Sequence, residues 1–294
     1  MERRAYYRNK TLPWLLIAPQ LLLVFVFFYW PTAQALYWAV TLEQPWGGGN
    51  AFVGFDNFML LFADSRYWAT VARSGIYAVL ATGLSMAGAL TLALFADRQL
   101  KGTRLFQSVY IWPYAIAAPA AGVAFRFMFS PQAGLVGMIN QVWPGIWDPS
   151  IIGWQALLMV IVCHAWLGIG YNFVFFLAAL QMIPRTISEA GAMDGARPLQ
   201  RMLDLQLPLI APTTFFLLII NLISSFTDSF GLIDTMTEGG PVGATELMVY
   251  KIYFDGFKGL DYSGAAAQSI VLMVLVIALT FIQFKWVERR IHYT

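Results

Sequence analysis

A set of polar residues lies on one face of an otherwise apolar segment near position 220. The members are spaced at i, i+3, i+4 and i+7: Asn221, Ser224, Ser225 and Asp228. This is the spacing of one face of an α-helix. Facing lipid, such groups would be costly, so the face is expected to point into a helix bundle or a water-filled path. The pattern predicts reversible binding of a hydroxyl-bearing ligand.

A second polar face lies in the apolar segment 152–181. His164, Gly168, Tyr171 and Asn172 fall on it, and we expect Tyr171 and Asn172 to join the same ligand path. Other readings stay open at this point. Ser224 and Ser225 can bond their own helix or a neighbouring one, His164 can be an interior packing residue, and Asp228 can cap or pair near the membrane surface.

Residue patterns for covalent chemistry are absent from the sequence. It contains no H-E-x-x-H for zinc, no G-x-S-x-G nucleophile elbow and no G-x-x-x-x-G-K-[ST] phosphate loop. Two histidines are too few for an imidazole-based metal cluster. The chain is therefore not expected to be an enzyme or to hold a metal or cofactor. If ATP is consumed, another chain must bind it.

The elements that carry these faces are expected to be membrane-spanning helices. With 59% hydrophobic and only 12% charged residues, the chain has too few charged side chains for the surface of a soluble domain. A bilayer crossing needs about 20 apolar residues. Segments of that length predict an all-α polytopic protein with six spans, in a single membrane domain over 1–294, at about 12–39, 71–96, 106–129, 152–181, 209–231 and 265–286.

Basic residues orient these spans. With both termini inside, the cytoplasmic segments hold most of the 18 basic residues, and the outer side keeps Arg66, Arg73, Arg126, Lys251 and Lys258. The charged start and following apolar run also resemble a signal peptide, but the run from Leu12 to Trp30 exceeds the usual 7 to 15 residues, so we expect the first span to be retained. The outer loops are then 41–69 and 232–264.

An islet of small and charged residues, EAGAMDGARPLQRMLDLQLP from Glu189 to Pro208, falls on the cytoplasmic side. Pro184 and Pro198 suit the first turn of a helix, so two short helices are predicted over about 184–194 and 198–206, with Gly195 as the break between them. The small side chains of the first helix would let another protein approach its backbone. An interfacial helix lying among the lipid headgroups is the alternative.

The islet resembles the EAA signature of permease subunits of bacterial ABC importers. That signature reads E-A-A, three residues, G, nine residues and I-x-L-P, and the chain matches it with Glu189-Ala190-Gly191, Gly195 and Leu205-x-Leu207-Pro208. Gly191 and Leu205 replace residues of similar size. The resemblance implies that the loop 184–208 docks on an ATPase subunit through Glu189, Ala190, Gly191, Ala192, Asp194, Gly195, Leu207 and Pro208.

Further stretches resemble the carbohydrate-uptake branch of these importers, and within it the permeases for sn-glycerol 3-phosphate. They are Ala18-Pro-Gln20, Trp112-Pro-Tyr114, Tyr171-Asn-Phe173, Thr237-Glu-Gly-Gly-Pro241, Tyr250-x-x-Tyr253 and Phe257-x-Gly-Leu-Asp261. The resemblance implies a bacterial inner-membrane subunit that works by alternating access. Its implied partners are a second permease in a heterodimer, two ATPase subunits that bind ATP and magnesium, and an extracytoplasmic binding protein. No nucleic-acid partner is implied.

The cargo itself is not specified by the residue inventory. No lysine lies deep inside a span, and Arg73 and Arg126 lie near outer ends. Either these arginines meet a phosphate at the entrance, or the partner permease and the binding protein select it. A permease of the same type for another sugar stays open. An ion-driven secondary transporter is a further alternative, but the internal repeat common in that class is not visible.

Overall fold

The computed structural model describes residues 11–43, 49–97 and 108–287. The basic N-terminal residues before Thr11, those between Asp97 and Ser108, and the last seven residues lie outside this range. The all-α prediction is confirmed, apart from one small hairpin. The helices group into two compact units, residues 1–64 with 252–271 and residues 65–251 with 272–294.

The first unit holds the N-terminal helix and a small outer-loop structure. Its elements are α1 (Thr11–Val24), the π-helical segment η1 (Phe25–Tyr29), α2 (Trp30–Ala39), β1 (Thr41–Glu43), β2 (Asn50–Phe52), α3 (Asp56–Ala63), the π-helical segment η5 (Phe254–Lys258) and the first part of α15 (Tyr262–Val287). The strands pair antiparallel, with Thr41 opposite Phe52. Asn57 Nδ2 donates to the carbonyl oxygens of Ala39 (2.9 Å) and Thr41 (3.0 Å), so α3 is tied to the end of α2.

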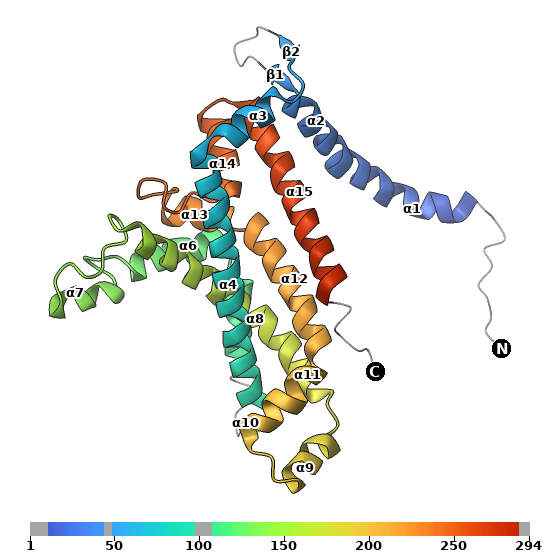
Figure 1. The fold of residues 1–294 in the computed structure, drawn as a ribbon, viewed down its shortest axis with the longest axis vertical. Coiled ribbons are helices and arrows are strands. Elements are labelled where there is room, and N and C mark those ends of the chain that lie inside the picture. Colours follow the sequence, from blue (N-terminus) through green and yellow to red (C-terminus); the bar gives the residue numbers. More distant parts are fainter. Residues whose placement is uncertain (1–10, 44–48, 98–107, 288–294) are drawn as a thin grey trace. The chain divides into compact units, whose positions relative to one another are not determined.

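The second unit is built around α4 (Ser65–Asp97), α8 (Gly153–Gln181) and α12 (Ala211–Thr227), seen in Figure 1. Its other elements are the 3₁₀ segment η2 (Trp112–Ala115), α6 (Ala118–Met128), the 3₁₀ segment η3 (Val136–Met138), α7 (Ile139–Val142), α9 (Arg185–Met193), α10 (Pro198–Gln200), the π-helical segment η4 (Arg201–Gln206), α11 (Leu207–Leu209), α13 (Phe230–Met236) and most of α14 (Met248–Tyr253).

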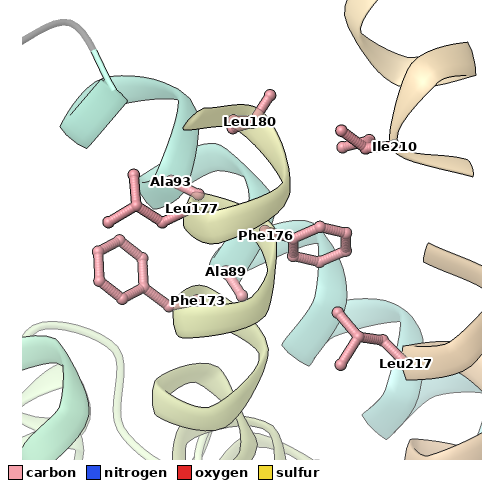
Figure 2. Packing of buried hydrophobic residues seen from close by; sticks show 8 residues of the cluster. All are labelled: Ala89, Ala93, Phe173, Phe176, Leu177, Leu180, Ile210 and Leu217. Carbon is pink, nitrogen blue, oxygen red and sulfur yellow. The ribbon is translucent and has the colours of Figure 1, made fainter. Parts of the chain in front are cut away.

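Small residues on α4 explain why α4 and α8 pack closely. The buried face of α4 includes Ala78, Ala81, Ser85, Ala89 and Ala93, at helical spacing. Short side chains let helix backbones approach within a membrane, where dispersion contacts drive association. Larger residues of α8 and α12, among them Phe173, Phe176 and Leu217, fill the space beside this face (Figure 2).

Helix length and composition identify the spans. Four helices are long and apolar enough to cross a membrane, at Thr11–Ala39, Ser65–Asp97, Gly153–Met182 and Tyr262–Lys285. Two bent pairs bring the number to six if each pair is one span, which agrees with a polytopic membrane protein. Those pairs are Ser108–Ala115 with Ala118–Met128, bent by 105°, and Pro198–Leu209 with Ala211–Thr227, bent by 71°.

Two of the intervals predicted as spans are interrupted. In 106–129 the chain is extended at Ile116 and Ala117, and Pro119 lies in the first turn of α6. Proline has no backbone N–H and disfavours helix before it, which is why the axis changes here. In 209–231 helix α12 ends at Thr227 and a new helix, α13, begins at Phe230. Asp228 therefore lies at a helix end rather than within a continuous span.

Candidate functional site

A cavity of about 360 Å³ lies between α8, α12 and the start of α6. It is lined by Tyr114, Ile116, Ala118, His164, Leu167, Gly168, Tyr171, Ile220, Asn221, Ser224, Asp228 and Leu232. The break between η2 and α6 thus contributes one wall, and the end of α12 contributes another. Four of the predicted path residues are brought together here: Tyr171, Asn221, Ser224 and Asp228.

The aromatic wall of the cavity combines Tyr114 with Tyr171. Their ring centroids are 5.5 Å apart, and the ring centroids of Tyr171 and Phe175 are 4.8 Å apart. Tyrosine presents an apolar ring together with a hydroxyl group. Such a wall can pack against the carbon skeleton of a small polyol and still offer a hydrogen bond.

Asn172 and Ser225, the other two predicted path residues, do not line the cavity. Asn172 is fully buried, and it forms a reciprocal amide pair with Asn221. Asn172 Nδ2 donates to Asn221 Oδ1 (2.9 Å), and Asn221 Nδ2 donates to Asn172 Oδ1 (2.7 Å). Ser225 Oγ donates to the Asn221 carbonyl oxygen (2.8 Å) and lies 3.3 Å from Thr82 Oγ1. Both residues therefore lie behind the cavity wall, where they connect helices.

The amide pair is anchored at both ends. Asn172 Nδ2 also donates to Ser85 Oγ on α4 (2.8 Å), and Asn221 Nδ2 also donates to the Leu217 carbonyl oxygen (2.7 Å). All four amide hydrogens are thereby used, which removes the penalty for burying them. The network holds α4, α8 and α12 in one register beneath the cavity.

Asp228 lies at the end of α12 and is exposed. Its Oδ1 accepts a hydrogen bond from Thr227 Oγ1 (3.0 Å). The last carbonyl groups of a helix carry partial negative charge. Together with the carboxylate they make this end of the cavity a region that favours hydrogen-bond donors over anions.

His164 and its partner Tyr77 were not among the predicted path residues. Tyr77 OH lies 2.8 Å from His164 Nδ1, and the rings meet edge to face at 5.5 Å. Tyr77 is completely buried on α4. The helical spacing of His164 with Gly168 and Tyr171 indicated the face, but nothing in the sequence near Tyr77 indicates that it lies behind His164.

The two arginines considered for the entrance are placed differently from each other. Arg73 Nη2 donates to Thr70 Oγ1 (2.9 Å), and Arg73 Nε donates to the Glu246 carbonyl oxygen (3.4 Å). Arg126 Nη1 donates to the Thr235 carbonyl oxygen (3.3 Å) and lines a second cavity of about 320 Å³ with Ser130 and Thr237. Neither arginine lines the cavity beside Asp228.

The islet folds into helices close to the predicted bounds. Helix α9 ends at Met193 and is followed by Gly195 at φ +83°. The N–H groups of Gly195 and Ala196 donate to the carbonyl oxygens of Ala192 (3.1 Å) and Gly191 (3.0 Å). These two bonds form a Schellman motif, which requires a left-handed residue that glycine supplies without strain. The local chemistry of Gly195 thus sets the break. Pro184 is the N-cap of α9, and Pro198 is the first residue of the second helix, 198–209.

The islet presents an exposed surface. Glu189, Ala190, Ala192, Asp194, Gly195 and Pro208 are exposed, whereas Gly191 and Leu207 are partly covered. Three large apolar side chains join that surface, with exposed fractions of 88% for Met193, 62% for Leu199 and 49% for Leu203. A Cβ on Gly191 would lie 2.8 Å from Leu205 Cδ1, so the absence of a side chain there lets the two islet helices pack.

No group of three or more potential metal-ligating side chains occurs in the described part of the chain. The polar groups of the larger cavity are instead amide, hydroxyl, imidazole and carboxylate groups suited to reversible hydrogen bonding.

Comparison with known proteins gives a consistent result. The family described as "Binding-protein-dependent transport system inner membrane component" matches residues 89–293. The chain is similar to the sn-glycerol-3-phosphate transport system permease protein UgpA of Rhizobium meliloti (strain 1021), with 45% identity and 99% of each chain covered. The same-named protein of Agrobacterium fabrum (strain C58 / ATCC 33970) is 46% identical, with 98% of each chain covered.

Solved structures show the same fold at lower identity. A bacterial ABC transporter involved in the import of the acidic polysaccharide alginate matches with a TM-score of 0.82 and 21% identity, over 95% of each chain. The MetNI methionine ABC transporter matches with a TM-score of 0.54 and 19% identity, over 80% of this chain and 98% of that one.

These similarities confirm the resemblance seen in the islet and its surroundings. The relatives are transport permeases rather than enzymes, and ATP is hydrolysed by a separate subunit in such systems. Since the family covers residues 89–293 and curated relatives align over almost the whole length, the chain belongs to the inner-membrane permease components of binding-protein-dependent ABC importers.

Proposed function

We propose that the chain carries sn-glycerol 3-phosphate into the cytoplasm as one permease of an ATP-driven importer. The observation that carries this proposal is the 45% identity, over 99% of both chains, to a permease named for that cargo. The match spans 99% of this chain, so it includes the segments that form the cavity as well as the islet. The cavity volume of about 360 Å³ lies within the range of sites that bind small ligands.

The importer is proposed to contain a second permease, forming a heterodimer with this chain, two ATPase subunits and an extracytoplasmic binding protein. Both termini lie in the cytoplasm in this proposal, supported by the concentration of basic residues in the cytoplasmic segments. The islet then faces the ATPase subunits. By the same distribution of basic residues, the outer loops 41–69 and 232–264 face the binding protein.

The larger cavity is proposed to be this chain's share of the substrate path. Tyr171, Asn221, Ser224 and Asp228 would contact the cargo directly. Asn172 and Ser225 would act behind them, because their hydrogen bonds hold Asn221 and the surrounding helices in place.

Coupling to ATP is assigned to the islet. Closure of the ATPase subunits would press on α9, and the second helix, 198–209, continues into α12 across a 71° bend. A push on the islet therefore reaches the helix that bears Asn221 and is capped by Asp228. ATP shifts such a two-state bundle only as far as it binds one state better than the other.

Uptake into vesicles that hold the complete importer tests this proposal. Radiolabelled sn-glycerol 3-phosphate, maltose and inorganic phosphate are offered in parallel. ATP is either supplied on the side of the ATPase subunits or omitted. We expect ATP-dependent uptake of sn-glycerol 3-phosphate only. Uptake of maltose alone would retain the importer mechanism and reject the cargo. Uptake that follows an imposed sodium or proton gradient without ATP would favour a secondary transporter instead.

A further inference from the structure

A buried hydroxyl group favours one tautomer of His164. Tyr77 is completely buried, and within the described part of the chain the partner of its hydroxyl is His164 Nδ1, at 2.8 Å. A buried O–H without an acceptor is costly, so Tyr77 donates and Nδ1 accepts. In the neutral ring the proton then lies on Nε2. His164 lines the cavity, and Nε2–H is the ring group that remains for a ligand.

Asp228, a negatively charged hydrogen-bond acceptor, lines the same cavity. Asp228 stands at the C-terminal end of α12, where the helix carbonyl groups add to the negative potential of the carboxylate. One carboxylate oxygen accepts from Thr227. Among the described residues that line the cavity, Asp228 carries the only charged side chain. A phosphate group placed here would be repelled, whereas a hydroxyl group would be held.

We infer that this cavity binds the hydroxyl end of the cargo, with His164 Nε2–H as donor, Asp228 as acceptor and specificity-determining residue, and Tyr77 as the positioning residue that fixes His164. A hydroxyl group both accepts and donates, so it can satisfy the two side chains at once. The phosphate end points away from Asp228, and its cationic contacts come from another part of the importer. The inference rests on the proposed function, because it assumes a cargo with hydroxyl groups at one end and phosphate at the other.

The test measures which end of the cargo Asp228 contacts. Radiolabelled sn-glycerol 3-phosphate is equilibrated by dialysis with the complete permease and ATPase assembly without the binding protein, so that the Kd reports the membrane site. Unlabelled glycerol and inorganic phosphate then compete separately. In Asp228→Asn we expect glycerol to compete about 10-fold less well, since a charge-assisted hydrogen bond becomes a neutral one, while competition by phosphate is unchanged or stronger.

A different result identifies a different orientation. If phosphate competes better in Asp228→Asn while glycerol competes as in the wild type, the phosphate end lies at Asp228 and the inference is overturned. Binding and vesicle uptake by the wild-type importer are measured first. Their absence for sn-glycerol 3-phosphate would reject the proposed cargo and this inference with it, whereas wild-type uptake with unaltered glycerol competition in the variant would reject the inference alone.

Tyr77 is tested through His164. Tyr77→Phe keeps the ring and removes the hydroxyl, and we expect the Kd to rise about 3- to 10-fold. Adding it to His164→Ala should cause no further loss, since Tyr77 acts only through that ring. Independent, additive losses would contradict a positioning role. Ser74→Ala is the matched control, because Ser74 Oγ also makes a buried bond from α4, accepting from Met248 N (2.9 Å), and it lies outside the cavity. Its Kd should stay at the wild-type value.

Discussion

The amide pair between Asn172 and Asn221 gives a quantitative prediction. It makes four hydrogen bonds: two between the amides, one to Ser85 Oγ and one to the Leu217 carbonyl oxygen. Asn172→Leu removes three of them, and so does Asn221→Leu. At about 0.6 to 1 kcal/mol per bond between membrane helices, each single change should lower the free energy of unfolding by about 2 to 3 kcal/mol.

The double variant should cost much less than the two single changes together. It removes all four bonds once, whereas adding the single costs counts the two mutual bonds twice. We therefore expect a coupling free energy of about 1 to 2 kcal/mol. The assay is a double-mutant cycle on the full-length chain in bicelles, with unfolding followed by steric trapping.

If the cost of the double variant equals the sum of the two single costs within about 0.5 kcal/mol, the reasoning is refuted. That outcome would mean that the two amides do not bond across α8 and α12. Thr91→Ala serves as a control, because Thr91 is exposed and its Oγ1 donates to the Ala87 carbonyl oxygen of its own helix. It should change stability by less than about 0.5 kcal/mol.

Four glycines give further predictions. Gly195→Pro should abolish ATP-dependent uptake with membrane insertion retained, because proline cannot adopt the observed φ of +83° and the end of α9 would unravel; immunoblotting of membranes and vesicle uptake check both parts. Gly191→Ala should keep uptake within about twofold, since Leu205 can rotate away from the added methyl group, whereas Gly191→Phe should separate the islet helices and uncouple ATP hydrolysis from uptake. Gly170→Ala should lower the free energy of unfolding by about 1 to 3 kcal/mol, because the added Cβ would lie 2.8 Å from the backbone oxygen of Tyr110. Gly83→Ala is the control, since a Cβ at Gly83 has no neighbouring atom within 4 Å, and it should be neutral or slightly stabilising. Thermal unfolding measures both.

The islet could be predicted from sequence because its structure is set locally. Proline at the start of a helix and glycine in the left-handed conformation after a helix act within one turn. Pro198 therefore directly indicates where the second islet helix starts, and Gly195 indicates the break between the two helices. The general helical architecture follows from hydrophobic length, which is also a local property.

The cavity could be predicted only in part. The polar face of α12 was visible from its spacing, but the partners that satisfy it come from α4 and α8, far away in the chain. This is why Asn172 and Ser225 were expected in the path, although they bond Asn221 and neighbouring helices instead. Tyr77 was missed for the same reason. Its partner His164 lies 87 residues further along the chain, and no local pattern shows which side chain of α8 meets Tyr77.

The helix end at Thr227 was also not predicted. Hydropathy alone carries the fifth span past Asp228, because Phe226, Phe230 and Leu232 keep the average high. Thr227, Asp228 and Ser229 are weak helix formers whose side chains compete for backbone groups. Their effect places Asp228 at the end of α12, where its carboxylate reaches the cavity.

The most direct test of ATP-driven import through this chain is the ratio of cargo taken up to ATP hydrolysed in vesicles with the complete importer and the binding protein outside. We expect uptake of sn-glycerol 3-phosphate to require both ATP and the binding protein, and to rise in proportion to hydrolysis. Sustained uptake by this chain alone, without an ATPase subunit or ATP, would contradict the account.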